Sequence, residues 1–214
     1  VAALSASLRA ATEQLTAPGA PFELAQKNVN GVAMRCYANA PANLREALDA
    51  GRAHGDKVAV TYQDERYTFT EFFAAADRFS NYLMHEAGIR KGDRVAIAMR
   101  NYPEWMFAFV GTLAVGAVVV PVNSWGRAEE LAYALTDAGA RVVVCDPERH
   151  TLLREHLATL DCTAIVVHSA GANIAPAIAW ETTQAADAQR PDVSLDAQDL
   201  GMIMYTSGTT GKPK

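Results

Sequence analysis

Apolar residues follow two different spacings along the central part of the chain. Short runs such as Val142–Val144 and Ile165–Val167 are apolar at every position, which is typical of strands that are buried on both faces. Between these runs, apolar residues such as Leu153 and Leu157 recur at helical spacing. Strands that alternate with helices predict βαβ units, and therefore an α/β fold with a mostly parallel sheet and helices on both faces.

The same spacings predict the individual elements and two units. Thr70 is the expected N-cap of one helix, and Asp146 is the expected N-cap of another. The helix after Asp146 should bury Leu153, Leu157 and Leu160. Residues 1–41 are predicted to form an N-terminal helix and an unpatterned extended arm, lying on the domain or on a partner. Residues 42–214 are predicted to form an α/β subdomain, in which 168–199 is a surface excursion with one short helical piece. Helices are expected at 1–16, 43–51, 70–88, 101–115, 127–138 and from 147 onward, and strands at 57–62, 66–69, 95–99, 117–121, 141–145, 163–167 and 201–205.

A loop of glycines, hydroxyls and a lysine follows the apolar run 201–205. Glycines allow close backbone approach, so successive N–H groups can converge on an anion, while hydroxyls and a lysine add donors and charge. The loop is no Walker A motif, because Thr206 stands where that motif needs a glycine, and the chain has no Gly-x-Gly-x-x-Gly. We therefore predict a polyphosphate-binding loop made of Thr206, Ser207, Gly208, Thr209, Thr210, Gly211 and Lys212.

Composition and charge exclude several classes of function. The net charge is −5 and lysine and arginine form no block, so nucleic-acid binding is not expected. The 3 cysteines lack Cys-x-x-Cys spacing and suggest reduced thiols in a cytoplasmic protein. The 5 histidines show no metal spacing, and no Gly-x-Ser-x-Gly elbow exists, so neither a metal site nor a hydrolase nucleophile is expected. Residues 105–122 lack charge, but glycines and Pro121 interrupt them, which favours a buried helix and strand over a membrane span.

Two further stretches are weaker candidates for ligand contacts. Residues 101–105 (Asn-Tyr-Pro-Glu-Trp) are polar and aromatic, and they suit a helix start about as well as a ligand contact. Residues 122–126 (Val-Asn-Ser-Trp-Gly) follow a predicted strand, where α/β folds collect ligands. They suit either a simple strand-to-helix loop or the lining of a substrate or coenzyme path.

Three motifs in order resemble those of one enzyme family. The phosphate loop, Tyr205-Thr-Ser-Gly-Thr-Thr-Gly-Lys-Pro-Lys214, is similar to the signature of the adenylate-forming superfamily of acyl-CoA synthetases, firefly-type luciferases and adenylation domains. Tyr67-Thr-Phe-Thr-Glu-Phe72 and Leu113-Ala-Val-Gly-Ala-Val-Val-Val-Pro-Val-Asn123 resemble two further segments of that family. The likeness covers roughly residues 40 to 214 and implies the N-terminal part of the large domain of such an enzyme.

The resemblance implies a reaction in two halves. A carboxylate attacks the α-phosphorus of ATP, giving an acyl-adenylate and pyrophosphate, and coenzyme A then displaces AMP to form a thioester. The resemblance assigns the pyrophosphate to Thr206 through Lys212, and it places the magnesium-binding acid, the acyl pocket and the catalytic lysine downstream of this chain. No catalytic residue is therefore expected here, and the chain alone should be inactive. A fatty acid is the favoured substrate, while an aryl-CoA ligase, another carboxylate-adenylating enzyme or a non-catalytic module stays open.

Overall fold

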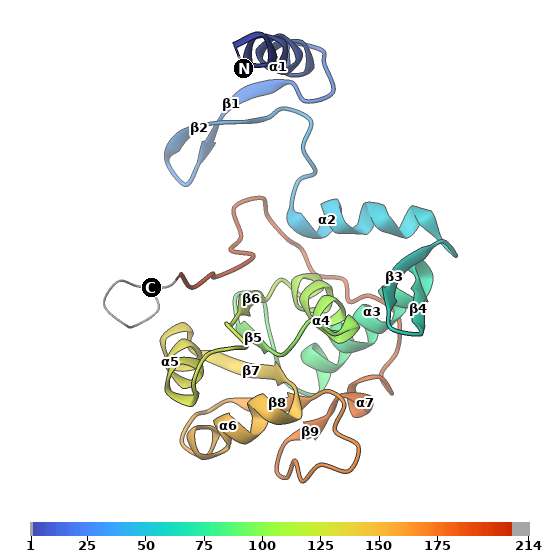
Figure 1. The fold of residues 1–214 in the computed structure, drawn as a ribbon, viewed down its shortest axis with the longest axis vertical. Helices are drawn as coiled ribbons and strands as arrows, with labels where there is room; N and C mark the ends of the chain where they lie inside the picture. The colour runs from blue at the N-terminus through green and yellow to red at the C-terminus, as the bar shows by residue number, and fades with distance from the viewer. Residues whose placement is uncertain (1, 207–214) are drawn as a thin grey trace.

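A computed structural model describes residues 2–206 (Figure 1). They form a parallel sheet of 5 strands, two antiparallel hairpins, and helices on both faces of the sheet. The helices are α1 (Ala2–Thr16), α2 (Leu44–Asp49), the 3-10 helix η1 (Ala50–His54), α3 (Phe69–His85), α4 (Pro103–Ala114), α5 (Ala128–Ala138), α6 (Pro147–Leu157) and α7 (Trp180–Thr183). The strands are β1 (Leu24–Val29), β2 (Val32–Tyr37), β3 (Val58–Tyr62), β4 (Glu65–Thr68), β5 (Arg94–Ala98), β6 (Val118–Pro121), β7 (Ala140–Cys145), β8 (Thr163–Val166) and β9 (Ile178–Ala179).

The parallel sheet has the strand order β6-β5-β7-β8-β9. Successive side chains of a strand point to opposite faces, so Val95 and Ile97 of β5 join one core cluster and Ala96 and Ala98 join the other. Helices α3 and α4 cover the first face, and α5 and α6 cover the second. This arrangement confirms the predicted α/β fold, and it explains why Val95–Ala98 of β5 and Val142–Cys145 of β7 are apolar at successive positions.

The segment 17–41 differs from the prediction, because it contains a β-hairpin instead of an unpatterned arm. Strands β1 and β2 pair antiparallel and are joined by Asn30 and Gly31, whose φ angles are 50° and 82°. Two positive φ angles in an Asn-Gly loop are typical of the hairpin turn that matches the twist of its strands. Figure 1 shows α1 and this hairpin standing apart from the sheet. The backbone N–H of Asn30 donates a hydrogen bond at 3.2 Å to Oε1 of Gln198, which lies in the segment after α7.

Three other boundaries differ from the expectation. The cap of α3 is Thr68 instead of Thr70, because Thr68 and Glu71 form a reciprocal capping box. The excursion 168–199 contains the short helix that the sequence predicts, α7, and it also supplies the edge strand β9, which was not expected. The run 201–205 is no buried strand: it makes a single bridge, Val119 to Met202, and Met202 and Met204 are 40% and 65% exposed.

The uncharged stretch 105–122 folds as the end of α4 followed by β6, as predicted. Among residues 2–206, no helix combines the length and the apolarity that a bilayer crossing requires. The capping residue Asp146 and the proline that follows it begin α6 as predicted, and Leu153 is fully buried. Leu157 and Leu160 are only partly buried, and Leu160 lies beyond the end of the helix.

Candidate functional site at the carboxyl edge of the sheet

The carboxyl ends of β5 and β7 form the point where the winding of the sheet reverses. The connection from β5 through α4 leads to β6 on one side, whereas β7 and β8 lie on the other side of β5. In sheets of this order, the crevice outside the carboxyl ends at the reversal is the usual place for a ligand. The loops that follow β5, β6 and β7 therefore form the candidate site.

Asp146 links the ends of β5 and β7. Its side chain is buried and caps α6 by accepting a hydrogen bond from Arg149 N–H at 2.9 Å. The other carboxylate oxygen accepts from the backbone N–H of Arg100 at 3.1 Å, just after β5. One carboxylate thus fixes the positions of two strand ends and a helix start.

Arg149 extends this network to the loop after β6. The guanidinium is 3% exposed, pairs with Asp146 at 3.3 Å and donates from Nε to the carbonyl oxygen of Ser124 at 2.7 Å. Its other ion pair is with the exposed carboxylate of Glu148. The Asp146–Arg149 pair therefore holds all three loops in one arrangement. Local spacing offers no signal for Arg149, because an arginine in a weakly amphipathic helix is expected to face the solvent.

Arg100 and Trp125 form the exposed part of the site. The guanidinium carbon of Arg100 lies 3.3 Å from the centre of the Trp125 ring, and Trp125 is 74% exposed. Within residues 2–206, no carboxylate or carbonyl oxygen accepts a hydrogen bond from the Arg100 side chain. A stacked guanidinium in this position keeps its edge free for an anion, while the indole offers a flat surface to a planar group.

The stretch 101–105 begins α4, with Tyr102 as the capping residue and Pro103 in the first turn. The helix-start interpretation is confirmed, and the ligand contact stays a prediction. The Tyr102 ring lies 4.5 Å from the ring of His168, which follows β8, and His168 Nε2 is 3.2 Å from Glu104 Oε2. Burial, followed by the charge of Asp146, raises the pKa of Tyr102 above its ordinary value. This hydroxyl is consequently held in its neutral form.

The segment that leads to the predicted phosphate loop runs beside β6. Ile203 N–H donates to Val119 O at 2.9 Å and Val119 N–H donates to Gly201 O at 3.0 Å, in parallel register. Tyr205 is fastened to α5 through a 2.6 Å hydrogen bond to Asp137. A parallel neighbour of β6 ends at the same edge as β6, so exposed Thr206 emerges on the side of the loop 122–126. The other predicted site residues, Ser207 through Lys212, lie outside the described residues.

The described residues show no metal site. No group of three His, Cys, Asp or Glu side chains within residues 2–206 could hold a metal ion. The acids of the edge, Asp146 and Glu104, are each engaged with a basic side chain. These residues therefore do not fit a magnesium ion, and no step is assigned to one here.

Comparisons with known proteins agree with this geometry. The family model described as "AMP-binding enzyme" matches residues 48–214. The chain is 37% identical over 151 residues to the long-chain-fatty-acid–CoA ligase FadD13 of Mycobacterium tuberculosis (strain ATCC 25618 / H37Rv), covering 71% of the chain and 29% of that enzyme. It is 34% identical over 156 residues to a feruloyl-CoA synthase of Amycolatopsis sp, covering 73% and 29%.

One of the similar solved structures is described as ATP-bound. ATP-bound MatB from Rhodopseudomonas palustris superposes with a TM-score of 0.69 at 29% identity, over 82% of this chain and 34% of that chain. The matched residues, 151 and 156 of the 214, span 29% of the length of each of the two curated relatives above.

Proposed function

The chain belongs to the family of AMP-binding enzymes, and from this premise we propose that it is the N-terminal piece of an ATP-dependent acid–CoA ligase. Such a ligase joins a carboxylate to AMP with release of pyrophosphate, and then transfers the acyl group to the thiol of coenzyme A. The relatives that support the proposal carry acid–CoA ligase or CoA synthase names, and one similar structure is described as ATP-bound.

One observation carries the proposal: the segment before the phosphate loop is fastened at the carboxyl edge of the sheet. Because Ile203 pairs with β6 and Tyr205 is bonded to α5, the chain reaches Thr206 at the edge of the sheet where β6 ends. Backbone N–H groups, hydroxyls and Lys212 in that place would stabilise the charge that develops on pyrophosphate as it leaves.

Arg100 and Trp125 are the further contacts that we propose for this edge. The Arg100 guanidinium would bind a phosphate of the nucleotide or of coenzyme A, and the exposed face of Trp125 would stack on a planar ring. The Asp146–Arg149 pair does not touch the ligand in this proposal. It positions the backbone at Arg100 and at Ser124, from which these two contacts project.

A fatty acid is the proposed substrate, and an aryl acid is the alternative. Identity to the fatty-acid ligase is 37% and identity to the feruloyl-CoA synthase is 34%, so the preference is slight. Magnesium would be held by residues of the longer ligase that follow this chain, where the resemblance places the acid that binds it. A cytoplasmic location also stays a proposal, supported by free Cys145 and Cys162. Burial raises the pKa of both thiols, that of Cys162 to about 12, so neither is activated for redox chemistry.

The test is a panel of carboxylic acids offered with ATP and magnesium, followed through the release of pyrophosphate. The longer ligase that contains this chain should release pyrophosphate with fatty acids at least about tenfold faster than with aryl acids, as expected for an apolar acyl pocket. The 214-residue chain by itself should show no turnover. Turnover by the isolated chain, or no release with any acid, would contradict the proposal.

A further inference from the structure

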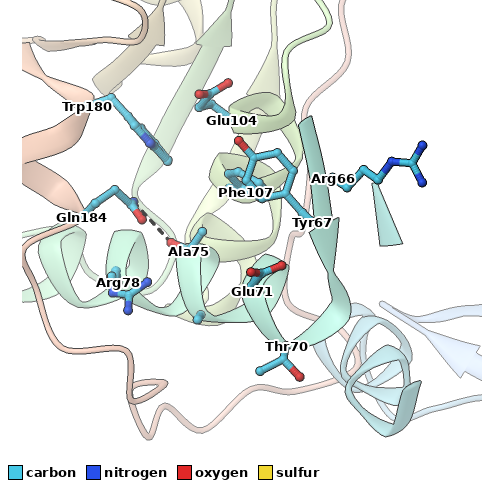
Figure 2. Close-up of a pocket in the computed structure, with 11 residues that line it drawn as sticks. Arg66, Tyr67, Thr70, Glu71, Ala75, Arg78, Glu104, Phe107, Trp180 and Gln184 are labelled. Carbon is cyan, nitrogen blue, oxygen red and sulfur yellow. Dashed lines mark hydrogen bonds between the residues drawn. The ribbon is translucent and has the colours of Figure 1, made fainter. Parts of the chain in front are cut away.

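A second concave site lies between α3, α4, β4 and α7, away from the loop 122–126 (Figure 2). Its volume is about 430 Å³, which suits a small organic molecule. We call it the α3–α4 hollow. Its walls and rim include Tyr67, Glu71, Ala75, Glu104, Phe107 and Trp180.

Small and aromatic residues create the hollow. Ala74 and Ala75 leave one side of α3 without bulk, so the space between that helix and α7 stays open. Three rings border it: Phe107 and Trp180 are almost fully buried, and the Tyr67 ring meets Phe107 edge-on at 5.2 Å. Rings with fixed positions provide a wall whose faces attract cations.

Two carboxylates, Glu71 and Glu104, border the hollow. Glu71 uses one oxygen in the capping box with Thr68, at 2.8 and 3.0 Å, and its second oxygen remains available. Glu104 borders the other end, and its side chain is 14% exposed. The pKa of Tyr67 is raised by burial, by its hydrogen bond to Glu65 and by the charges of Glu65, Glu104 and Glu71. The negative charges of three carboxylates therefore reach the Tyr67 hydroxyl, which forms part of the wall of the hollow.

Within residues 2–206, the two arginines nearby form no ion pair with these carboxylates. Figure 2 shows Arg66 pointing away from the space that Trp180, Glu104, Tyr67 and Glu71 surround. Arg78 lies at the rim, and in the described part of the chain it forms no ion pair. His168 contacts Glu104 at 3.2 Å, on a side chain that still reaches the hollow. A cationic ligand would give Glu104 and Glu71 a partner inside the hollow, which neither arginine provides through an ion pair in the described part of the chain.

We propose that the α3–α4 hollow binds a small organic ammonium ion, with its apolar body against Tyr67, Phe107 and Trp180 and its charge near Glu104 and Glu71. The aromatic faces and the carboxylates favour the same charge, and the alanines leave room for the body of the ligand. Glu104 lies in the hollow and also contacts His168 at the carboxyl edge. The site still does not require the proposed ligase activity, because it shares no residue with the predicted phosphate loop or with the Asp146–Arg149 network.

The test uses the 214-residue chain and three probes of similar size: benzylammonium, benzyl alcohol and benzoate. In amide-detected NMR, benzylammonium should shift the indole N–H signal of Trp180 and the side-chain amide of Gln184, which both border the hollow. Benzyl alcohol, which lacks the charge, should bind at least about tenfold more weakly. Equal affinity for the alcohol would reduce the hollow to a general apolar cavity and overturn the proposal.

Three variants locate the interaction. Glu104→Gln should weaken benzylammonium binding about tenfold, whereas Glu155→Gln, an exposed acid on α6, should leave it unchanged. Arg78→Gln should bind the cation as tightly or more tightly, since it removes a like charge from the rim. The signals of β5 and β7 report whether each variant keeps the fold. Preference for benzoate that disappears in Arg78→Gln, or full affinity in Glu104→Gln, would overturn the proposal.

Discussion

Different features of the sequence specify two regions of the molecule. These are the N-terminal unit, residues 2–41, and the sheet-bearing body, residues 43–206. In residues 5–41 no side chain falls in the buried class, and Leu8 and Val32 are about 60% exposed. The body contains two core clusters, one on each face of the sheet. The fold of the body follows from burial, which requires apolar residues at periodic positions in the sequence. The hairpin instead depends on its turn residues, Asn30 and Gly31.

The largest difference between the two units should come from the buried ion pair of the body. Asp146→Ala leaves the guanidinium of Arg149, which is 3% exposed, without its buried partner. We expect the free energy of unfolding to fall by about 3 kcal/mol, as measured by urea denaturation. The matched variant Glu148→Ala removes a carboxylate that is 68% exposed, and it should cost less than about 1 kcal/mol. Equal losses of unfolding free energy in the two variants would show that the burial of Asp146 contributes nothing to stability.

Close helix packing should give the next largest effect. A Cβ atom at Gly111 would lie 2.6 Å from the carbonyl oxygen of Ala76 and 2.9 Å from Phe79, where α4 meets α3. Gly111→Ala should therefore lower the free energy of unfolding by about 1–2 kcal/mol, since overpacking outweighs the gain in helix propensity. Gly201→Ala is the control, because its Cβ would meet atoms only at 3.7 Å. A stabilised Gly111→Ala protein would contradict the observed helix contact.

The cap of α3 should give a smaller effect. Thr68→Ala should cost about 1 kcal/mol, while Thr70→Ala should stay within about 0.5 kcal/mol. Thr68 holds the pKa of Glu71 below its usual value, chiefly through its backbone N–H and then through its hydroxyl. The stability that comes with this lowered pKa is present at neutral pH and is lost as the pH falls through it. The cost of Thr68→Ala should therefore shrink in acid. A larger loss of unfolding free energy in Thr70→Ala than in Thr68→Ala would show that Thr70 is the cap, as the sequence predicts.

The N-terminal unit should show the smallest effect. Val32→Ala, at a side chain that is 60% exposed, should change the stability of the body by less than about 0.5 kcal/mol. Removing residues 1–41 should likewise leave the melting temperature of the body unchanged in calorimetry. A drop of several degrees would show that the unit packs on the body, and would remove the contrast between the two regions.

Sequence reasoning predicted the fold well where burial enforces it. The alternation of apolar strands with helices gave the parallel sheet and its two covered faces, and Asp146-Pro147 located the start of α6. The hairpin was missed because apolar spacing was weighed there and the Asn30-Gly31 turn was not. The apolar residues of the run 201–205 predict a buried strand, but the single bridge to β6 leaves Met202 and Met204 exposed.

The candidate site was predictable only in part. The stretch 122–126 was recognised as a strand-end loop, and Asp146 as a helix cap. Their connection through Arg149 and the stacking of Arg100 on Trp125 join residues that are far apart in the chain. No local spacing encodes such contacts, because they arise when the ends of different strands meet at one edge of the sheet.

The binding of ATP by the longer ligase that contains this chain tests the central claim most directly. The claim is that the loop from Thr206 to Lys212 holds the phosphates of a nucleotide at the carboxyl edge of the sheet. In calorimetric titration with magnesium, Lys212→Ala should weaken ATP binding at least about tenfold, the loss expected for one charged phosphate contact. Lys57→Ala, a change of the same kind in the turn before β3, should have no effect. Unaltered ATP affinity in Lys212→Ala, or no ATP binding by the unmodified ligase, would contradict the account.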